Sequence, residues 1–319
     1  QPKATEFGML QRLASCIQTP NVFTPGSTCG EQRKDAHLWT FGMMAYPQND
    51  PDESHTAKLA VIWGENTIHT MKYDNINRIQ KAGGKIIVID PMNIHTAYYR
   101  QEKIVRDATQ ATLWIKPRPA SDGVLVMGFL KVIIEGELYD KDVVKNWTVG
   151  FDELKEEMKK FTLDDVERLT WVPKKQVIEA ARMIATIKPC TVKLGNALEL
   201  YGSSCTQALR AMTIIRGICG HLDIPGGDVF ATRQAPTLYP LGRFYLLKLR
   251  KDSYEHAAGK DFPWALRCAY TPEQCFHRNV LEGGPHTVRA LIVCVSNPLL
   301  TWPDAKKVHE AMMKLDFIL

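Results

Sequence analysis

The sequence predicts an α/β protein with two nucleotide-binding parallel-sheet units of the Rossmann-like kind. Two short apolar strands, Leu59–Trp63 and Lys85–Ile89, end in small or acidic turn residues. Strands alternate with helical patterns from Lys58 to about Asp140, and a second alternating stretch begins at Thr191. This alternation is typical of a parallel sheet with helices on both faces.

The first half of the chain supports this fold element by element. Apolar residues recur on one face of the segment Thr5–Ile17, which predicts an amphipathic helix. In chain order we then expect a helix over 31–46, a loop over 47–56, the strands 59–63 and 85–89, an insertion over 98–109, an apolar helix that opens at Asp122, and helices over 141–187.

The second half repeats the alternation after Lys188-Pro189. We expect a strand over 191–194, a turn at Gly195-Asn196, a helix over 206–219, a strand over 288–295 and a helix over 304–314. Between them, residues 228–285 are polar, aromatic and basic with little periodicity, as in a long surface excursion. The sequence therefore predicts two domains, residues 1–187 and residues 188–319.

Composition agrees with a globular enzyme. The chain has 319 residues, is 45% hydrophobic and carries a net charge of +5, with acidic and basic residues interspersed. This balance implies neither a nucleic-acid partner nor a membrane surface, and we expect no membrane span. The eight cysteines include no closely spaced pair, so no zinc or iron–sulfur site is expected within the chain. Cys219 and Cys294 lie in apolar segments and are interpreted as buried.

Three turns resemble parts of a nucleotide site. Asp90-Pro91 follows a strand, and Asp122 opens a helix. In an open α/β sheet, ligands bind beyond the carboxyl ends of the strands, where an acid can accept hydrogen bonds from a ribose or a guanine. The turn Gly64-Glu65-Asn66-Thr67 has small and polar residues that let backbone N–H groups approach a diphosphate. Gly64, Asp90 and Asp122 are expected to line one crevice, and Gly195 and Asn297 a second.

Cys29 is the exceptional cysteine. It follows the turn Pro25-Gly26-Ser27-Thr28 and precedes an expected helix, so the helix dipole would favour its thiolate. A soft thiolate is also a possible ligand of a transition metal.

These pieces, in this order, resemble the catalytic subunit of the molybdopterin oxidoreductases, the dimethyl sulfoxide reductase superfamily. The resemblance rests on Thr19-Pro20-Asn21 with Cys29, Trp63-Gly64-Glu65-Asn66, Ile89-Asp90-Pro91, Thr96-Ala97, Arg118-Pro119-Ala120-Ser121-Asp122, Gly217–Gly227 and Ser296-Asn297-Pro298. It covers nearly the whole chain, as a central fragment. The chain would then lack the family's amino-terminal cluster region and its carboxy-terminal barrel domain.

The resemblance implies molybdenum or tungsten held by two molybdopterin guanine dinucleotides, with Cys29 as catalytic residue and metal ligand. The implied cofactor-binding residues are Gly64, Glu65, Asn66, Asp90, Pro91, Thr96, Ser121, Asp122, Gly195, Asn196 and Asn297. The reaction would be oxygen- or sulfur-atom transfer, or related redox chemistry, on a small-molecule substrate. In such a family, residues 228–285 would form a substrate funnel or subunit contacts.

Departures from the family pattern narrow the function. Met92-Asn93 stand where the family usually has arginine, which weakens the detailed cofactor contacts. Gly30 and Leu198-Glu199 stand where formate dehydrogenases of this family carry histidine and Gln-His, which argues against formate oxidation. Relatives with a cysteine ligand include a tungsten hydratase of acetylene, so non-redox hydration stays open. A metal-free scaffold is a further alternative. A nicotinamide dehydrogenase is disfavoured, because no G-x-G-x-x-G follows the first strand.

Other residues are given plainer interpretations. His37 is interpreted as a partly exposed helix residue, with the metal site as the alternative, and His69 and His95 as polar loop residues that could touch phosphate. Asn196 and Glu199 could position substrate. Trp63, Trp114 and Trp147 are assigned to the core, with nucleotide stacking as the alternative.

Partners and compartment follow from the resemblance alone. We expect an iron–sulfur electron-transfer subunit, and a [4Fe-4S] cluster in the region before Gln1 rather than in this chain. The compartment is the cytoplasm or the periplasm, of which the cytoplasm is favoured.

Overall fold

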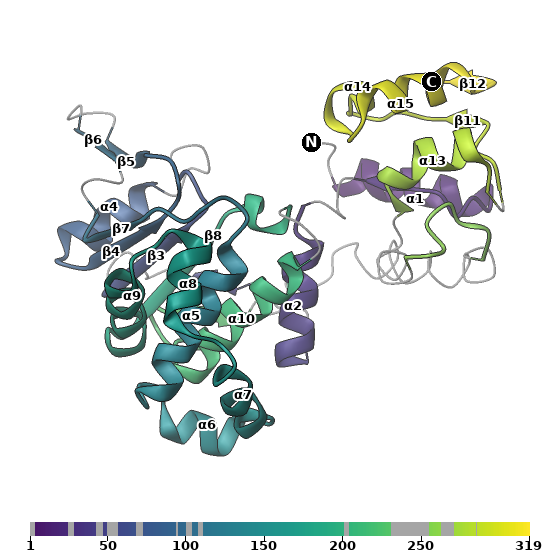
Figure 1. Ribbon diagram of the computed structural model, residues 1–319. Helices are drawn as coiled ribbons and strands as arrows, with labels where there is room; N and C mark the ends of the chain where they lie inside the picture. The colour runs from purple at the N-terminus through teal and green to yellow at the C-terminus, as the bar shows by residue number, and fades with distance from the viewer. Residues whose placement is uncertain are drawn as a thin grey trace. The chain divides into compact units, whose positions relative to one another are not determined.

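The computed structural model (Figure 1) divides by its contacts into two units, residues 32–232 and residues 1–31 with 233–319. The residues that it describes are 4–24, 29–42, 47–49, 57–67, 73–93, 95–99, 104–107, 111–200, 204–230, 255–262, 271–284 and 286–319. His69, the turn 25–28 and much of the 228–285 stretch therefore lie outside the described residues.

A four-stranded parallel sheet forms the centre of the unit 32–232. Its strand order is β7-β4-β3-β8, and the strands are β3 (Leu59–Trp63), β4 (Lys85–Ile89), β7 (Leu113–Ile115) and β8 (Cys190–Leu194). All five residues of β3 are buried, as expected for a central parallel strand with both faces covered. The predicted α/β fold class with parallel strands is confirmed.

The predicted domain boundary at residue 188 lies inside the unit 32–232. Strand β8 was expected to begin a second sheet, but it pairs with β3 along its whole length, from Leu59 opposite Cys190 to Trp63 opposite Leu194. The helices between β7 and β8 return the chain to the free edge of β3. Alternation of strands and helices identifies a parallel sheet, but it does not specify which strands become neighbours.

Helices cover both faces of this sheet (Figure 1). On one face the main core gathers residues of β3, β4, β7 and β8 with α5 (Asp122–Glu135), α9 (Lys174–Thr186) and α10 (Cys205–Ile218). On the other face Ile76 and Ile79 of α4 (Tyr73–Lys81) pack on Ala60, Ile62 and Val88. The described residues of the unit also form the helices α2 (Glu31–Phe41), α6 (Lys141–Trp147), α7 (Phe151–Met158), α8 (Leu163–Thr170) and the 3₁₀ helix η3 (Asn196–Glu199).

Two short antiparallel strand pairs also belong to this unit. The insertion expected over 98–109 contains part of a hairpin, β5 (His95–Tyr99) with β6 (Ile104–Asp107). The expected loop 47–56 begins with β2 (Pro47–Asn49), which pairs with β9 (Asp228–Phe230). The helix expected over 31–46 is shorter and ends at Phe41, before Gly42 adopts a positive φ of 73°.

The second unit joins the start of the chain to its end. Its elements are α1 (Ala4–Cys16), β1 (Phe23–Thr24), β10 (Thr271–Pro272), α13 (Gln274–Glu282), β11 (Ala290–Leu291), α14 (Pro298–Thr301), α15 (Ala305–Met313) and β12 (Phe317–Ile318). Among the described residues of this unit, β1 pairs with β10 and β11 with β12, each in parallel. Phe276, Trp302 and Val308 form its small core. The strand expected over 288–295 is regular at 290–291, with further backbone hydrogen bonds at Arg289 and Val293, and Cys294 is exposed rather than buried.

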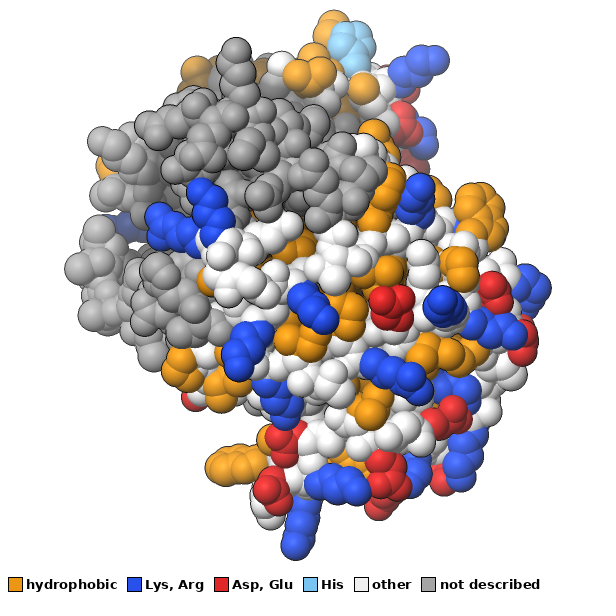
Figure 2. Space-filling view, turned by 90° about the vertical axis from the view of Figure 1, so that its left-hand side faces the viewer, with side chains coloured by type: hydrophobic (Ala, Val, Ile, Leu, Met, Phe, Trp, Pro, Cys, Tyr) orange, Lys and Arg blue, Asp and Glu red, His pale blue; other side chains and the backbone are white. Residues whose placement is uncertain are grey.

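The charges on the surface are mixed, as the interspersed acidic and basic residues of the sequence predict. Figure 2 shows Lys and Arg side chains mixed with Asp and Glu over the visible face rather than separated into blocks. Within the described parts of the chain, no helix has the length and apolar character needed to cross a membrane.

Candidate functional site

The carboxyl edge of the parallel sheet brings three of the predicted turns together. Ladder hydrogen bonds continue to this edge: the Gly64 amide donates to the Ile89 carbonyl (2.9 Å), and the Asp90 amide to the Ile115 carbonyl (3.0 Å). Because the strands are parallel, the residues after β3, β4 and β8 all emerge here.

Two glycines make the closest backbone approach at this edge. The Gly195 amide donates to the Trp63 carbonyl (2.8 Å), and a Cβ atom at Gly195 would lie 1.6 Å from the Gly64 carbonyl oxygen. Gly64 itself has a positive φ of 59°. The turn after β8 therefore packs directly on the turn after β3. Gly195 was predicted to line a second crevice with Asn297, but it lies beside Gly64 because β8 belongs to the first sheet.

Asp90 lies at the end of β4 with a constrained carboxylate. One oxygen, Oδ1, accepts from the Met92 amide (2.8 Å), and the Asp90 carbonyl accepts from the Trp114 indole (3.0 Å). Burial raises the pKa of Asp90, the hydrogen bond from Met92 opposes this, and the charge of Asp122 adds to it. The charge of Asp122 therefore reaches Asp90 across the sheet edge.

Asp122 begins α5, the helix that covers the main core. Its Oδ1 accepts a hydrogen bond of 2.7 Å from the Trp63 indole Nε1. Burial raises the pKa of Asp122, and this hydrogen bond partly offsets the effect. The preceding residue, Ser121, is buried and its hydroxyl donates to the Arg118 carbonyl (2.6 Å), which closes the turn before the helix.

The other predicted residues of this unit lie at the same edge or nearby. Glu65 is buried and Asn66 half-buried in the turn after β3, and Pro91 is exposed after β4. Thr96 lies in β5, where only the backbone is described. His95 lies in the same strand, so its contacts are likewise outside the description.

An ion pair at the turn after β8 was missed by the sequence analysis. Arg33 of α2 lies 2.6 Å from Oε1 of Glu199, whose side chain is fully buried. The same guanidinium donates to the Asn196 side-chain oxygen (3.2 Å). Helix α2 is thereby attached to η3, so Glu199 has a structural contact rather than an open carboxylate. No periodicity in the sequence signals a contact between residues so far apart.

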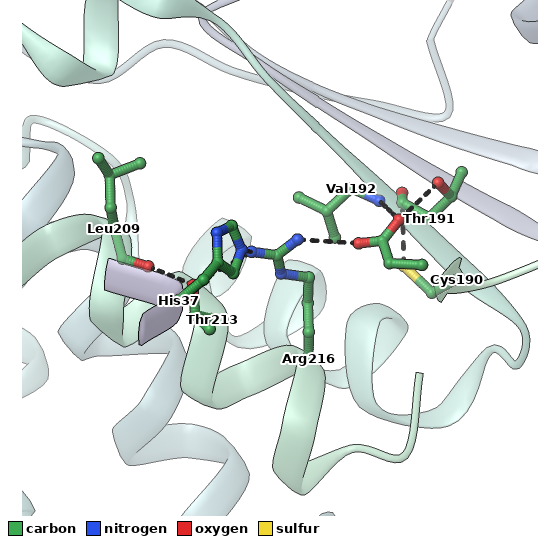
Figure 3. Close-up of polar contacts among 8 residues, drawn as sticks. His37, Cys190, Thr191, Val192, Leu209, Thr213 and Arg216 are labelled. Atoms are coloured by element: carbon green, nitrogen blue, oxygen red, sulfur yellow. Dashed lines mark hydrogen bonds and ion pairs between the residues drawn. The ribbon is translucent and has the colours of Figure 1, made fainter. Parts of the chain in front are cut away.

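A buried polar network joins α2, α10 and β8 (Figure 3). Arg216 of α10 donates to the carboxylate of Asp228 (3.0 Å), to His37 Nε2 (2.9 Å) and to Thr213 Oγ1 (3.1 Å). Asp228 also accepts from the Thr191 hydroxyl at 3.0 Å.

His37 is buried, not partly exposed as predicted. Burial, followed by the charge of Arg216, lowers the pKa of His37 from 6.5 to about 3, so the ring is a neutral acceptor. The metal-site alternative for His37 is not supported by these contacts, which face into the core.

The tryptophans differ from one another. Trp63 is in the core as predicted, with 2% of its surface exposed, but its indole N–H reaches a site residue. Trp114 is half-buried at the sheet edge, where the Lys116 ammonium lies 4.0 Å from its ring centroid. The assignment of Trp147 to the core is wrong, because 85% of its surface is exposed at the end of α6.

Cys29 and Asn297 belong to the other unit and are described within it. Cys29 is exposed, and Gly30 after it has a positive φ of 95° that leads into the first turn of α2. Asn297 is exposed and precedes α14, where its carbonyl accepts from the Thr301 hydroxyl (2.9 Å). Ser296 and Pro298 line a cleft of about 650 Å³ that lies between α1 and residues 286–296.

Comparisons with known proteins agree with this arrangement. The family model described as molybdopterin oxidoreductase matches residues 3–319. Acetylene hydratase of Syntrophotalea acetylenica is 29% identical over 98% of this chain and 44% of its own length. Formate dehydrogenase H of Escherichia coli is 24% identical over 85% of this chain and 38% of its own length. The solved structure of acetylene hydratase from Pelobacter acetylenicus has the same fold, with a TM-score of 0.80 at 22% identity over 98% of this chain and 44% of that chain. The chain thus spans less than half the length of these relatives.

Proposed function

This chain belongs to the molybdopterin oxidoreductase family, and we propose that it is the part of a molybdenum or tungsten enzyme that holds two pterin guanine dinucleotides. The observation that carries this proposal is the pair of acids, Asp90 and Asp122, beside the close-packed glycine turns at one sheet edge. In α/β folds this edge is where nucleotides bind.

The residues of this edge fit a dinucleotide. Ionised carboxylates are acceptors only, and the guanine edge offers an N–H and an NH₂ group as donors. Asp122 begins a helix of 14 residues, and the dipole of a helix amino terminus favours an anion. Gly195 leaves no room for a side chain at the backbone contact between the two turns, and Gly64 has a positive φ of 59°. We infer that these residues bind and orient one dinucleotide, and that Asn297 contacts the second.

Cys29 is the proposed protein ligand of the metal. Its thiol is exposed, and Cys29 lies two residues before α2 begins at Glu31. When bound, the metal and its pterins supply the redox or Lewis-acid chemistry. The protein's contribution is to hold this group, to orient it and to shape access for a small substrate. Electrons would pass to a separate iron–sulfur subunit.

Hydration is a second candidate reaction for the same site. It is favoured by the 29% identity to acetylene hydratase, which extends over 98% of this chain. Oxygen- or sulfur-atom transfer requires an electron acceptor or donor, whereas addition of water to a triple bond requires no net electron transfer. Product formation from acetylene without any redox partner would therefore favour hydration, and turnover only with an electron carrier would favour atom transfer. A metal-free scaffold would show neither.

The experiment that tests the proposal compares Cys29→Ala with the control Cys16→Ala in the native, cofactor-loaded protein. Cys16 is also an exposed thiol, on α1, so it controls for loss of a surface cysteine. We expect metal-edge X-ray absorption to show loss of one sulfur ligand in Cys29→Ala, with most activity lost and nucleotide retained. Cys16→Ala should match the parent. Absence of molybdenum and tungsten from the parent would overturn the proposal in favour of the scaffold.

A further inference from the structure

The indole of Trp63 is fixed between the core and the carboxylate of Asp122. Trp63 is the last residue of β3 and only 2% of its surface is exposed. Its ring packs edge-on against Phe129 of α5 with a centroid distance of 5.7 Å. Its Nε1–H donates to Asp122 Oδ1 at 2.7 Å. Because the ring is held by the core, the hydrogen bond fixes the orientation of the carboxylate as well.

The kind of donor determines what Asp122 can still bind. Indole is a neutral donor with a single N–H, so it orients the carboxylate without cancelling its charge. An arginine or lysine at this point would instead form an ion pair and occupy the acceptor. A carboxylate oxygen has about two acceptor positions, so Asp122 keeps acceptor capacity for further donors.

We propose that Trp63 is a positioning residue that holds the Asp122 carboxylate for recognition of guanine and rejection of adenine. Guanine presents two adjacent donors, N1–H and the 2-amino group, to an acceptor. Adenine presents an acceptor nitrogen beside its amino group, which would face the carboxylate lone pairs. The inference rests on the proposed function, because it assumes that a nucleotide occupies this sheet edge.

Trp114 provides a matched control at the same edge. Its indole donates to the backbone carbonyl of Asp90 (3.0 Å) rather than to a carboxylate. A phenylalanine at either position removes one indole N–H, but only Trp63→Phe removes a hydrogen bond to an acid side chain. The two variants therefore separate carboxylate positioning from general packing.

The pH dependence of nucleotide binding supplies a readout that packing alone would not change. Burial raises the pKa of Asp122, and the hydrogen bond from Trp63 lowers it because it stabilises the charged form. The neighbouring acid is Asp90, whose own pKa is raised by burial and by the charge of Asp122. Guanine binding needs ionised Asp122 and is lost as the pH falls through its pKa. Trp63→Phe should move this loss to higher pH.

The test is a calorimetric titration of the full chain, stripped of bound nucleotide, with GDP and with ADP between pH 5 and 8. We expect Trp63→Phe to weaken GDP binding about tenfold, which is the effect of losing one hydrogen bond to a charged group. ADP binding should stay the same, and the low-pH loss of GDP binding should move upward. Trp114→Phe should behave as the parent, and Asp122→Ala should bind GDP and ADP alike.

Failure of the inference is distinguishable from failure of the proposed function. If Asp122→Ala loses GDP preference but Trp63→Phe keeps the affinity and pH profile of the parent, Trp63 does not position the carboxylate. If the parent itself does not prefer GDP to ADP and Asp122→Ala changes nothing, guanine binding at this edge is wrong. If Trp63→Phe does not fold, the NMR signal of the Trp63 indole N–H in the parent tests the inference instead. It should shift on GDP addition and titrate with pH, and an unmoved resonance would overturn the inference.

Discussion

Replacement of Asp228 by alanine tests the buried polar network of Arg216, Asp228 and His37. The side chains of Arg216 and Asp228 are 1% and 0% exposed, so Asp228→Ala leaves a guanidinium charge without its carboxylate in the core. Breaking a buried pair from one side costs about 3–5 kcal/mol. Asp228 also accepts from the Thr191 hydroxyl (3.0 Å) and the Val192 amide (3.4 Å), which places the expected loss at the upper end. The whole free energy of unfolding of a domain is only about 5–15 kcal/mol, so this loss is a large part of it.

The assay is urea unfolding at pH 7, with Glu156→Ala as the control. Glu156 pairs with Lys159 on the surface of α7, where both side chains are more than half exposed, so its loss should cost under about 1 kcal/mol. The double variant Arg216→Met with Asp228→Ala removes both charges and should be more stable than Asp228→Ala alone. A free energy of unfolding for Asp228→Ala within about 1 kcal/mol of the parent would refute the reasoning.

Three further predictions concern the same unit. Gly195→Ala should destabilise the fold by about 1–3 kcal/mol and reduce nucleotide content, because its Cβ would lie 1.6 Å from the Gly64 carbonyl oxygen. The control Gly217→Ala should not, because its Cβ would make an ordinary contact at 3.6 Å. Equal melting temperatures of the two variants would contradict this prediction. His37→Gln should make the free energy of unfolding fall less steeply as the pH is lowered. The pKa of His37 is about 3 in the native state and 6.5 in the unfolded state, so between these values only the unfolded state binds the proton. In the parent this lowers the free energy of unfolding by ~1.4 kcal/mol per pH unit. If urea titrations at pH 4–6 gave the variant and the parent the same change of unfolding free energy with pH, the prediction would be wrong. Asp122→Ala should weaken nucleotide retention by about 1.5–3 kcal/mol while the fold persists, and equal nucleotide content in the variant and the parent would reduce Asp122 to a helix-initiating residue.

Local patterns in the sequence predicted the strands and helices of the first sheet well. The apolar run Leu59–Trp63, the run Lys85–Ile89 and the helix that begins at Asp122 all form as expected, because burial on both faces and turn chemistry are encoded locally. The order of the turns along the chain was also enough to predict that Asp90 and Asp122 lie at the same sheet edge, where the charge of Asp122 raises the pKa of Asp90.

Long-range pairing was not predictable in the same way. Strand β8 returns to β3 across more than a hundred residues, so Gly195 joined Gly64 rather than a second sheet. Likewise, nothing near His37 in the sequence indicates that Arg216 will bury it. The indole of Trp63 has two roles, core packing and a hydrogen bond to Asp122, and a single sequence shows only the first.

The nucleotide that native protein releases on denaturation tests the central claim most directly. The account predicts guanine nucleotide, about two per atom of molybdenum or tungsten, released intact from the family's dinucleotide form. Asp122→Ala purified in parallel should release less of it per protein. Release of adenine nucleotide, or of none from protein that contains the metal, would contradict the assignment of this sheet edge to guanine.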